Sequence, residues 1–405
     1  CSGRILGGGY LGIGKDGEED LLALIHVGDE YDKYLHAVVP PVFLNSLHVY
    51  DSVEDYNSVD IFSDDSFIYA RDGNPTVRIL ERKIAALERG TRAVVFASGM
   101  AAFTAAVFAT CKAGSHILCM RDVYMPVKRM IDTVFGPRFG MTVTFVSGND
   151  LQEIEDAVRE NTDLMILESP ATFVFRVVDL KAIAEIAERR GFKTYIDNSC
   201  LTPIFQKPLE MGIDLVMHTM SKFMGGHSDI VGGVLVGRDE ELMQRIMSQM
   251  RELFGGIMGP MEAWLTIRGL RTLEVRMQRF CETGLAVAEY LENHGKVKRV
   301  YYTGLSSHPQ ADIIARQQKG HSSLLSFELD TDSMEEVVRF ANRLRLFGKG
   351  CSWGGHESLV ILPLYKEPEE ALELIGADRK LIRIYCGLEG SAHLIADLEQ
   401  SLKQL

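Results

Sequence analysis

Seven short apolar runs between about residues 75 and 240 constrain the fold more than any other feature. Each run is rich in Val, Ile, Leu or Phe, as strands are when both faces of a sheet are covered. Segments with helical periodicity separate the runs, so the pattern predicts an α/β fold with a seven-stranded, mostly parallel sheet. The runs are AVVFA (93–97), HILCM (116–120), TVTFV (142–146), LMILES (164–169), KTYIDN (193–198), DLVMHT (214–219) and GGVLVG (232–237).

Two of the intervening helices carry clear start and stop signals. Pro75 suits the first turn of a helix, and Gly90 follows the last apolar residue of the same stripe. Asp179 can cap a second helix, which Gly191 would end.

The pattern changes past about residue 270. A long helical stretch at roughly 260–294 leads to separate strand-like runs and a C-terminal helix, which predicts a smaller α+β domain. We therefore expect an N-terminal arm over 1–65, a large domain over 66–270 and a C-terminal domain over 271–405.

Charge and hydropathy exclude several function classes. The formal net charge is −13 and no basic run occurs, which argues against nucleic acid or an anionic membrane as a general partner. Residues 93–111 are uncharged over the length of a spanning helix, but Ser98-Gly99 interrupts them. A buried strand, a turn and a buried helix fit this stretch better than a membrane span.

Cysteine usage predicts a reducing, cytoplasmic location and no metal site. The spacings are wide and no Cys-x-x-Cys occurs, so neither zinc nor a disulfide framework is indicated. No signal-peptide pattern is visible at the start of the sequence. The seven cysteines are at 1, 111, 119, 200, 281, 351 and 386.

Polar residues gather where the predicted strands end, and ligands of open α/β sheets bind at that edge. They are Gly99 and Met100 after the first run, Glu168, Asp197, and Thr219, Ser221 and Lys222 after the sixth. A strand-to-helix turn offers backbone N–H groups to a phosphate. A lysine can form a Schiff base, and an aspartate can pair with a protonated pyridine. Together they suggest pyridoxal 5′-phosphate (PLP).

The sequence also resembles a known family, the PLP enzymes of Cys/Met metabolism, or trans-sulfuration enzymes. The similarity runs in family order across nearly the whole chain. The matching motifs are YARDGNPTVRILERKIAALE (69–88), FASGMAA (96–102), LESP (167–170), IDNSCLTP (196–203), HTMSKFMGGHSDIVGG (218–233), WLTIRGLRTLEVRM (264–277) and LIRIYCGLE (381–389). The resemblance implies a type I aminotransferase-like fold and a homotetramer built from catalytic dimers.

The resemblance implies roles around the cofactor. Lys222 matches the Schiff-base lysine and Asp197 the partner of the pyridine nitrogen. Tyr124 matches a catalytic tyrosine that stacks on the cofactor ring. The matching phosphate ligands are Gly99, Met100, Thr219 and Ser221, with Tyr69 and Arg71 contributed by the neighbouring subunit.

Substrate contacts are implied in the same way. Arg383 and Ser352 match residues that hold the carboxylate of an amino-acid substrate, and Trp353 beside Ser352 is expected to contact the substrate as well. An arginine suits this role because its planar fork can bind a carboxylate through two hydrogen bonds.

Structural roles compete with several of these assignments. Asp197 and Ser221 could cap turns, Tyr124 and Trp353 could pack in the core, and Arg383 could form a structural ion pair. His218 and His227 fit packing better than ligand binding.

Three departures from the common γ-type pattern bear on the reaction. Met125-Pro126-Val127 follows Tyr124, Thr172 stands where an Asn is usual, and Ser352-Trp353-Gly354-Gly355 replaces Ser-Leu-Gly. All three resemble bacterial cystathionine β-lyase, although that subgroup tends to have Tyr at the position of Cys351. They favour carbon–sulfur β-elimination on a substrate such as L-cystathionine. The alternative is a methionine or cystathionine γ-lyase, or a γ-replacement synthase that uses an activated homoserine.

Two further classes stay open. One is a PLP-binding protein without lyase activity, which the set of Lys222, Asp197, Tyr124 and Arg383 argues against. The other is an NAD-dependent dehydrogenase, suggested only by GGGYLG at 7–12. That motif needs a strand before it and a helix after it, and the preceding residues do not read as such a strand.

Overall fold

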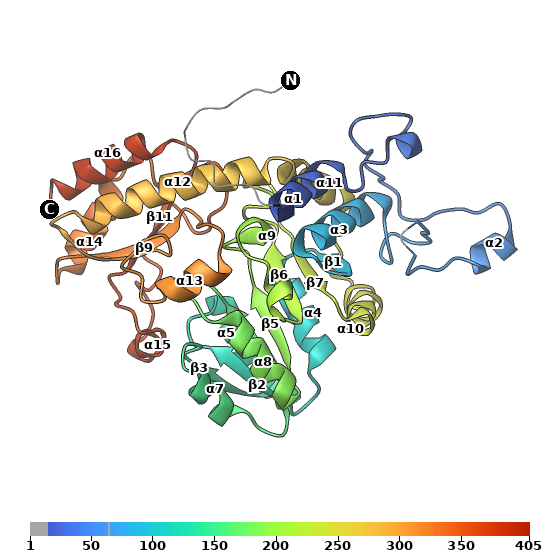
Figure 1. The fold of residues 1–405 in the computed structure, drawn as a ribbon, viewed down its shortest axis with the longest axis horizontal. Helices are drawn as coiled ribbons and strands as arrows, with labels where there is room; N and C mark the ends of the chain where they lie inside the picture. The colour runs from blue at the N-terminus through green and yellow to red at the C-terminus, as the bar shows by residue number, and fades with distance from the viewer. Residues whose placement is uncertain (1–14, 64) are drawn as a thin grey trace.

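The computed structural model describes residues 15–63 and 65–405, and a seven-stranded sheet lies at its centre (Figure 1). The strand order is β1-β7-β6-β5-β4-β2-β3; β7 is antiparallel to both of its neighbours, and the other pairs are parallel. This confirms the predicted sheet. The strands are β1 (Arg92–Phe96), β2 (His116–Met120), β3 (Thr142–Val146), β4 (Thr162–Glu168), β5 (Lys193–Asp197), β6 (Leu215–Thr219) and β7 (Gly233–Gly237).

Helices connect and cover these strands, so β2 and β7 are buried along their whole length. The apolar stretch at 93–111 becomes strand β1 and the buried helix α4, as expected. No described helix is both long and apolar enough to cross a membrane. The helices are α3 (Pro75–Glu88), α4 (Gly99–Thr110), α5 (Met125–Met130), α6 (Gly136–Phe139), α7 (Leu151–Ala157), α8 (Leu180–Arg190), α9 (Thr202–Phe205), α10 (Glu240–Arg245) and α11 (Pro260–Leu270).

The helix signals hold at three of four positions. Pro75 opens α3, Asp179 accepts the Ala182 N–H at the start of α8, and Gly191 ends α8 with φ 78°. The prediction for Gly90 was wrong, because Arg89 takes the left-handed conformation that ends α3. Gly90 serves close packing instead: a Cβ there would come within 2.5 Å of the Val236 side chain on β7.

A second, five-stranded sheet follows, in the order β10-β11-β12-β9-β8. The helical stretch predicted at 260–294 is two helices, α11 and α12, because the chain turns at Arg271-Thr272. The two-residue strand β10 was not predicted, and the domain boundaries stay a prediction. The elements are α12 (Leu273–Glu292), β8 (Val297–Tyr301), α13 (Ala311–Gln317), β9 (Leu324–Leu329), α14 (Met334–Arg343), β10 (Gly348–Lys349), β11 (Leu359–Ile361), α15 (Glu369–Ile375), β12 (Ile382–Tyr385) and α16 (Ser391–Leu402).

In the described part of the N-terminal arm, α1 (Lys15–His26) packs on α3 and buries Ala23 and Leu24. Further along the arm, the Phe43 N–H donates to Thr76 Oγ1 at 2.9 Å, and the Pro40 carbonyl accepts from Trp264 Nε1 at 3.0 Å. Beyond α1 the chain extends away from the body through α2 (Val53–Asn57) (Figure 1). Apolar side chains are left exposed there, with Leu35 96% and Val49 87% accessible. The GGGYLG segment lies outside the described residues.

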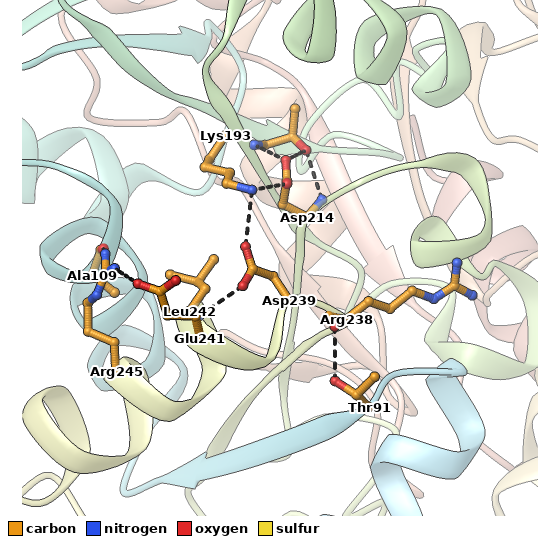
Figure 2. Close-up of polar contacts among 10 residues, drawn as sticks. Thr91, Ala109, Lys193, Asp214, Arg238, Asp239, Glu241, Leu242 and Arg245 are labelled. Carbon is orange, nitrogen blue, oxygen red and sulfur yellow. Dashed lines mark hydrogen bonds and ion pairs between the residues drawn. The ribbon is translucent and has the colours of Figure 1, made fainter.

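An ionic cluster joins strands and helix at the amino end of the parallel strands (Figure 2). Lys193, at the start of β5, lies 2.9 Å from Asp214 and 3.4 Å from Asp239. Asp239 also caps α10 by accepting the Leu242 N–H. The cluster joins the residues at which β5, β6 and α10 begin, at the edge of the sheet opposite the carboxyl ends of the parallel strands.

Candidate active site

The carboxyl ends of β4, β5 and β6 bring the central polar residues together. Glu168 pairs in register with Asp197, and Asp197 pairs with Met217, two residues before Thr219. Neighbouring parallel strands in register point their side chains to the same face. Glu168 and Asp197 therefore lie side by side, as the strand ends predicted.

Lys222 lies in the turn after β6 and meets a loop from the C-terminal half of the chain. Its Nζ donates to Ser352 Oγ at 2.5 Å and lies 5.3 Å from the centre of the Trp353 ring. Burial, and next the positive charge of Arg383, lower the pKa of Lys222 below its usual value. A larger share of its amine is therefore uncharged and nucleophilic at neutral pH.

Glycine allows the loop to approach Lys222 this closely. Gly354 has φ 95°, and a Cβ there would lie 2.7 Å from the backbone carbon of Lys222. Trp353 packs on Phe223 at 5.3 Å between ring centres, and the Tyr385 hydroxyl donates to Gly355 O at 2.6 Å. Trp353 thus has the packing role that competed with its substrate role, and it still covers Lys222.

Asp197 is a half-buried side chain at the carboxyl end of β5. Burial raises its pKa, while a hydrogen bond from Ser199 and the charges of His218 and Lys222 act in the opposite direction. The Ser199 N–H donates to Oδ1 at 2.9 Å, which fixes the carboxylate. This arrangement suits a carboxylate that pairs with a cationic ring nitrogen.

A candidate anion-binding cradle lies at the start of α4 and consists of Gly99, Met100, Thr219 and Ser221. The first N–H groups of a helix have no acceptor within the helix, and here they belong to Gly99 and Met100. A Cβ at Gly99 would lie 3.0 Å from Thr219 Cβ, so the glycine leaves room beside that hydroxyl. Ser221 Oγ accepts the Gly232 N–H at 3.2 Å, so it braces the turn and can still donate its own hydrogen.

These residues fit PLP. A nucleophilic amine, a half-buried carboxylate and a glycine-lined helix start with adjacent hydroxyls match the cofactor's aldehyde, pyridine nitrogen and phosphate respectively. Lys222, Asp197 and the cradle are the groups that would hold it.

Arg383 reaches the site from β12 of the smaller sheet. Its Nη1 donates to the carbonyl and hydroxyl oxygens of Thr172, both at 3.4 Å. Burial lowers the pKa of Arg383, and Glu168 is the opposite charge that most counteracts this. Thr172, one of the three departures from the γ-type pattern, therefore contacts the residue predicted to bind the substrate carboxylate.

Tyr124 precedes α5 and its side chain is 49% accessible. Burial raises the pKa of its phenol. Its backbone N–H donates to Glu168 Oε2 at 2.7 Å, so Glu168 holds the main chain in place at Tyr124. The sequence placed Glu168 at the strand end but indicated no role for it.

The structure does not bring Tyr69 and Arg71 to this site within one chain. They lie beyond the arm, with the Arg71 guanidinium 5.1 Å from the Tyr69 ring centre, and Tyr69 is 41% accessible. Among the described contacts, no hydrogen bond, ion pair or ring contact joins either residue to Lys222 or Asp197.

Behind the site lies a buried pair that sequence reasoning missed. Glu88 Oε1 lies 2.5 Å from His218 Nε2 and also accepts from Asn198 Nδ2 at 3.2 Å. His218 is thus a packed, partnered side chain. No local pattern could reveal the pair, since α3 and β6 are far apart in the sequence.

A cavity of about 590 Å³ lies elsewhere, between the loop after β3 and strand β8. None of the predicted site residues lines it. Two of its cations are already paired, Arg176 with Asp122 and Lys298 with Glu328. The predicted site residues therefore lie outside this cavity.

Comparison with known proteins agrees with the site. The family described as Cys/Met metabolism PLP-dependent enzyme matches residues 22–403. The L-methionine gamma-lyase of Fusobacterium nucleatum subsp. nucleatum is 35% identical over 94% of this chain and 97% of its own length. The cystathionine beta-lyase of Bacillus subtilis is 36% identical over 94% and 96%. A crystal structure of cystathionine gamma synthase from Xanthomonas oryzae pv. oryzae has a TM-score of 0.89 at 33% identity, covering 95% of this chain and 98% of that chain.

Proposed function

The chain belongs to the Cys/Met-metabolism family of PLP-dependent enzymes, and we propose that it is a carbon–sulfur lyase acting by β-elimination. The proposed substrate is a sulfur amino acid such as L-cystathionine. The family was identified from the sequence motifs, and PLP as the cofactor follows from it.

PLP supplies an electron sink that stabilises negative charge on the substrate's Cα. Arg383 binds the substrate carboxylate, and Asp197 balances positive charge at the pyridine nitrogen. Lys222 would hold PLP through its amine, and the same amine would take the proton from Cα. The bond between Cβ and sulfur breaks, and protonated Lys222 returns the proton to the departing sulfur. With one water, cystathionine yields homocysteine, pyruvate and ammonia.

One observation supports β- over γ-elimination: Lys222 is held by Ser352 at 2.5 Å and covered by Trp353 at 5.3 Å. A γ-elimination requires proton removal from Cβ as well as Cα, so the lysine must act at two neighbouring carbons. A lysine held from one side and covered by an indole has less room for that movement. The similarity of this loop to bacterial cystathionine β-lyase favours the same choice.

Identifying the keto acid formed from L-cystathionine tests the proposal. Purified, PLP-loaded protein is incubated with the substrate, and the products are separated by mass. We expect pyruvate with homocysteine. Formation of 2-oxobutyrate with cysteine would replace the proposal by γ-elimination, and cofactor-loaded protein without turnover would indicate a binding protein.

A γ-type reaction is the second candidate, because relatives of that type are about as similar to the chain as the β-lyase. They include the methionine gamma-lyase, and a cystathionine gamma-synthase of Mycobacterium bovis that is 37% identical over 93% of the chain. L-Methionine, and an activated homoserine supplied with a thiol, test this candidate with the same keto-acid assay and with thioether detection.

We also propose that the working enzyme is a cytoplasmic homotetramer built from catalytic dimers. The exposed apolar arm supports assembly, and Tyr69 and Arg71 lie where a second chain could use them. The described cysteines are all free thiols, which suits a reducing compartment. Light scattering after size exclusion tests the assembly, and a monomer at working concentration would contradict it.

A further inference from the structure

Glu168 occupies a central position that the proposed reaction does not use. It ends β4 in register with Asp197, and its Oε2 accepts the Tyr124 N–H at 2.7 Å. A single carboxyl group therefore adjoins the proposed partner of the pyridine nitrogen and holds the backbone of the proposed stacking tyrosine.

Two acidic side chains near Glu168 disfavour its ionisation, and one cation favours it. Asp197 on β5 and Asp122 before α5 are both acidic, and Arg383 on β12 is the cation that faces it. Burial and the charge of Asp197 raise the pKa of Glu168 well above its usual value, and they outweigh the Tyr124 N–H and the charge of Arg383, which act in the opposite direction. Glu168 and Asp197 are both half-buried, and two adjacent carboxyl groups with little access to water share one proton more readily than both ionise. Asp197 has the N–H of Ser199 and the charges of His218 and Lys222 to favour its ionised form.

We propose that Glu168 is a positioning residue that acts as a neutral acid: it holds Tyr124 through the backbone N–H and leaves the negative charge of the pair on Asp197. This inference rests on the proposed roles of Tyr124 and Asp197. The carbonyl oxygen of a protonated carboxyl group accepts an N–H as a carboxylate does. Glutamine has the same shape and the same acceptor, so it reproduces every feature required of Glu168.

The test compares Glu168→Gln with Glu168→Ala. Cofactor affinity is measured by titrating cofactor-free protein with PLP. The orientation of the cofactor ring is followed by circular dichroism in the visible absorption band. Glu153→Gln is the matched control, because Glu153 accepts a backbone N–H from Ser147 at 2.8 Å and contacts none of the site residues. Melting of the cofactor-free proteins shows whether each variant folds.

We expect Glu168→Gln and Glu153→Gln to retain PLP affinity within about threefold and to keep the visible dichroism. Glu168→Ala leaves the Tyr124 N–H without its acceptor, so affinity is expected to fall about 5- to 150-fold with a changed dichroism. Wild-type affinity and dichroism in Glu168→Ala would refute positioning. A loss in Glu168→Gln as large as in Glu168→Ala would refute the neutral acid. If alanine prevents folding, the glutamine variant still decides: affinity within about threefold of wild type supports the neutral acid, and a loss of about fivefold or more refutes it. Because these readouts need no substrate, they are independent of whether elimination is β or γ.

Discussion

Ser352 Oγ lies 2.5 Å from Lys222 Nζ, although 130 positions separate the two residues in the sequence. The contact joins the turn after β6 of the large sheet to the loop between β10 and β11 of the small one. Neither half of the chain contains the complete site. The amine that performs the proposed chemistry is positioned by one sheet and restrained by the other.

Replacing Lys222 by alanine tests the centre of the proposal. The variant loses the amine that anchors PLP covalently and moves the Cα proton, so turnover should fall by several orders of magnitude. The visible absorption of the lysine-bound cofactor should be lost as well. Absorption spectra and keto-acid release measure both effects, and wild-type retention of either one would contradict the assignment.

Replacing Arg383 by alanine should impair substrate capture more than cofactor content. Hydrogen bonds to a charged group contribute about 1.5–3 kcal/mol, so kcat/KM should fall about 10- to 150-fold, mainly through KM. Arg383→Lys keeps the charge but not the planar fork and should be intermediate. Steady-state kinetics with PLP quantification separate the two effects. Loss of PLP with unchanged KM would make Arg383 a structural residue.

The sequence predicted what short segments determine. The seven strands and the caps at Pro75, Asp179 and Gly191 depend on residues close together in the chain, and all are present. The prediction for Gly90 was wrong because a glycine after a helix can be required by close packing against the sheet rather than by the conformation of the turn. Strand β10 has two residues, too few for any periodicity.

The site was predictable only in part for the same reason. Strand-end positions brought Lys222, Asp197 and Glu168 together on general grounds, and family resemblance added Arg383 and Ser352. The hydrogen bond between Glu168 and the Tyr124 backbone joins residues that are 44 positions apart. Its donor is a main-chain N–H, which every residue except proline has, so the sequence does not reveal it. The contact of Arg383 with Thr172 depends on how the two sheets meet, which no local pattern encodes.

The ionic cluster at the amino end of the strands gives a stability prediction. A hydrogen bond from the Leu242 N–H, and the charge of Lys193, lower the pKa of Asp239 despite some burial. A lowered pKa stabilises the fold above the unfolded pKa of about 4, and this contribution is lost as the pH falls through the folded value.

Asp239→Ala should therefore lower the free energy of unfolding by about 1 kcal/mol at pH 7, mainly through loss of the α10 cap. The difference from wild type should shrink below about pH 4. Urea melts across this pH range measure it. Asp239→Asn keeps the cap and should cost less, whereas equal losses in both variants would assign the effect to the ion pair with Lys193.

Trp353→Ala tests whether the indole that covers Lys222 determines the choice between β- and γ-elimination. Removing the indole that lies 5.3 Å from Lys222 Nζ frees space on one side of the amine while Ser352 keeps its contact on the other. If the cover restricts Lys222 to the proton on Cα, the variant should release some 2-oxobutyrate from L-cystathionine beside pyruvate. Trp353→Phe keeps an aromatic cover and should stay closer to wild type in product ratio. Mass analysis of the keto acids gives the ratio directly, and it does not depend on how much enzyme is active. A pure pyruvate product from a slower Trp353→Ala enzyme would mean that Trp353 supports the loop, and that the choice of bond must come from how Arg383 and Thr172 orient the substrate.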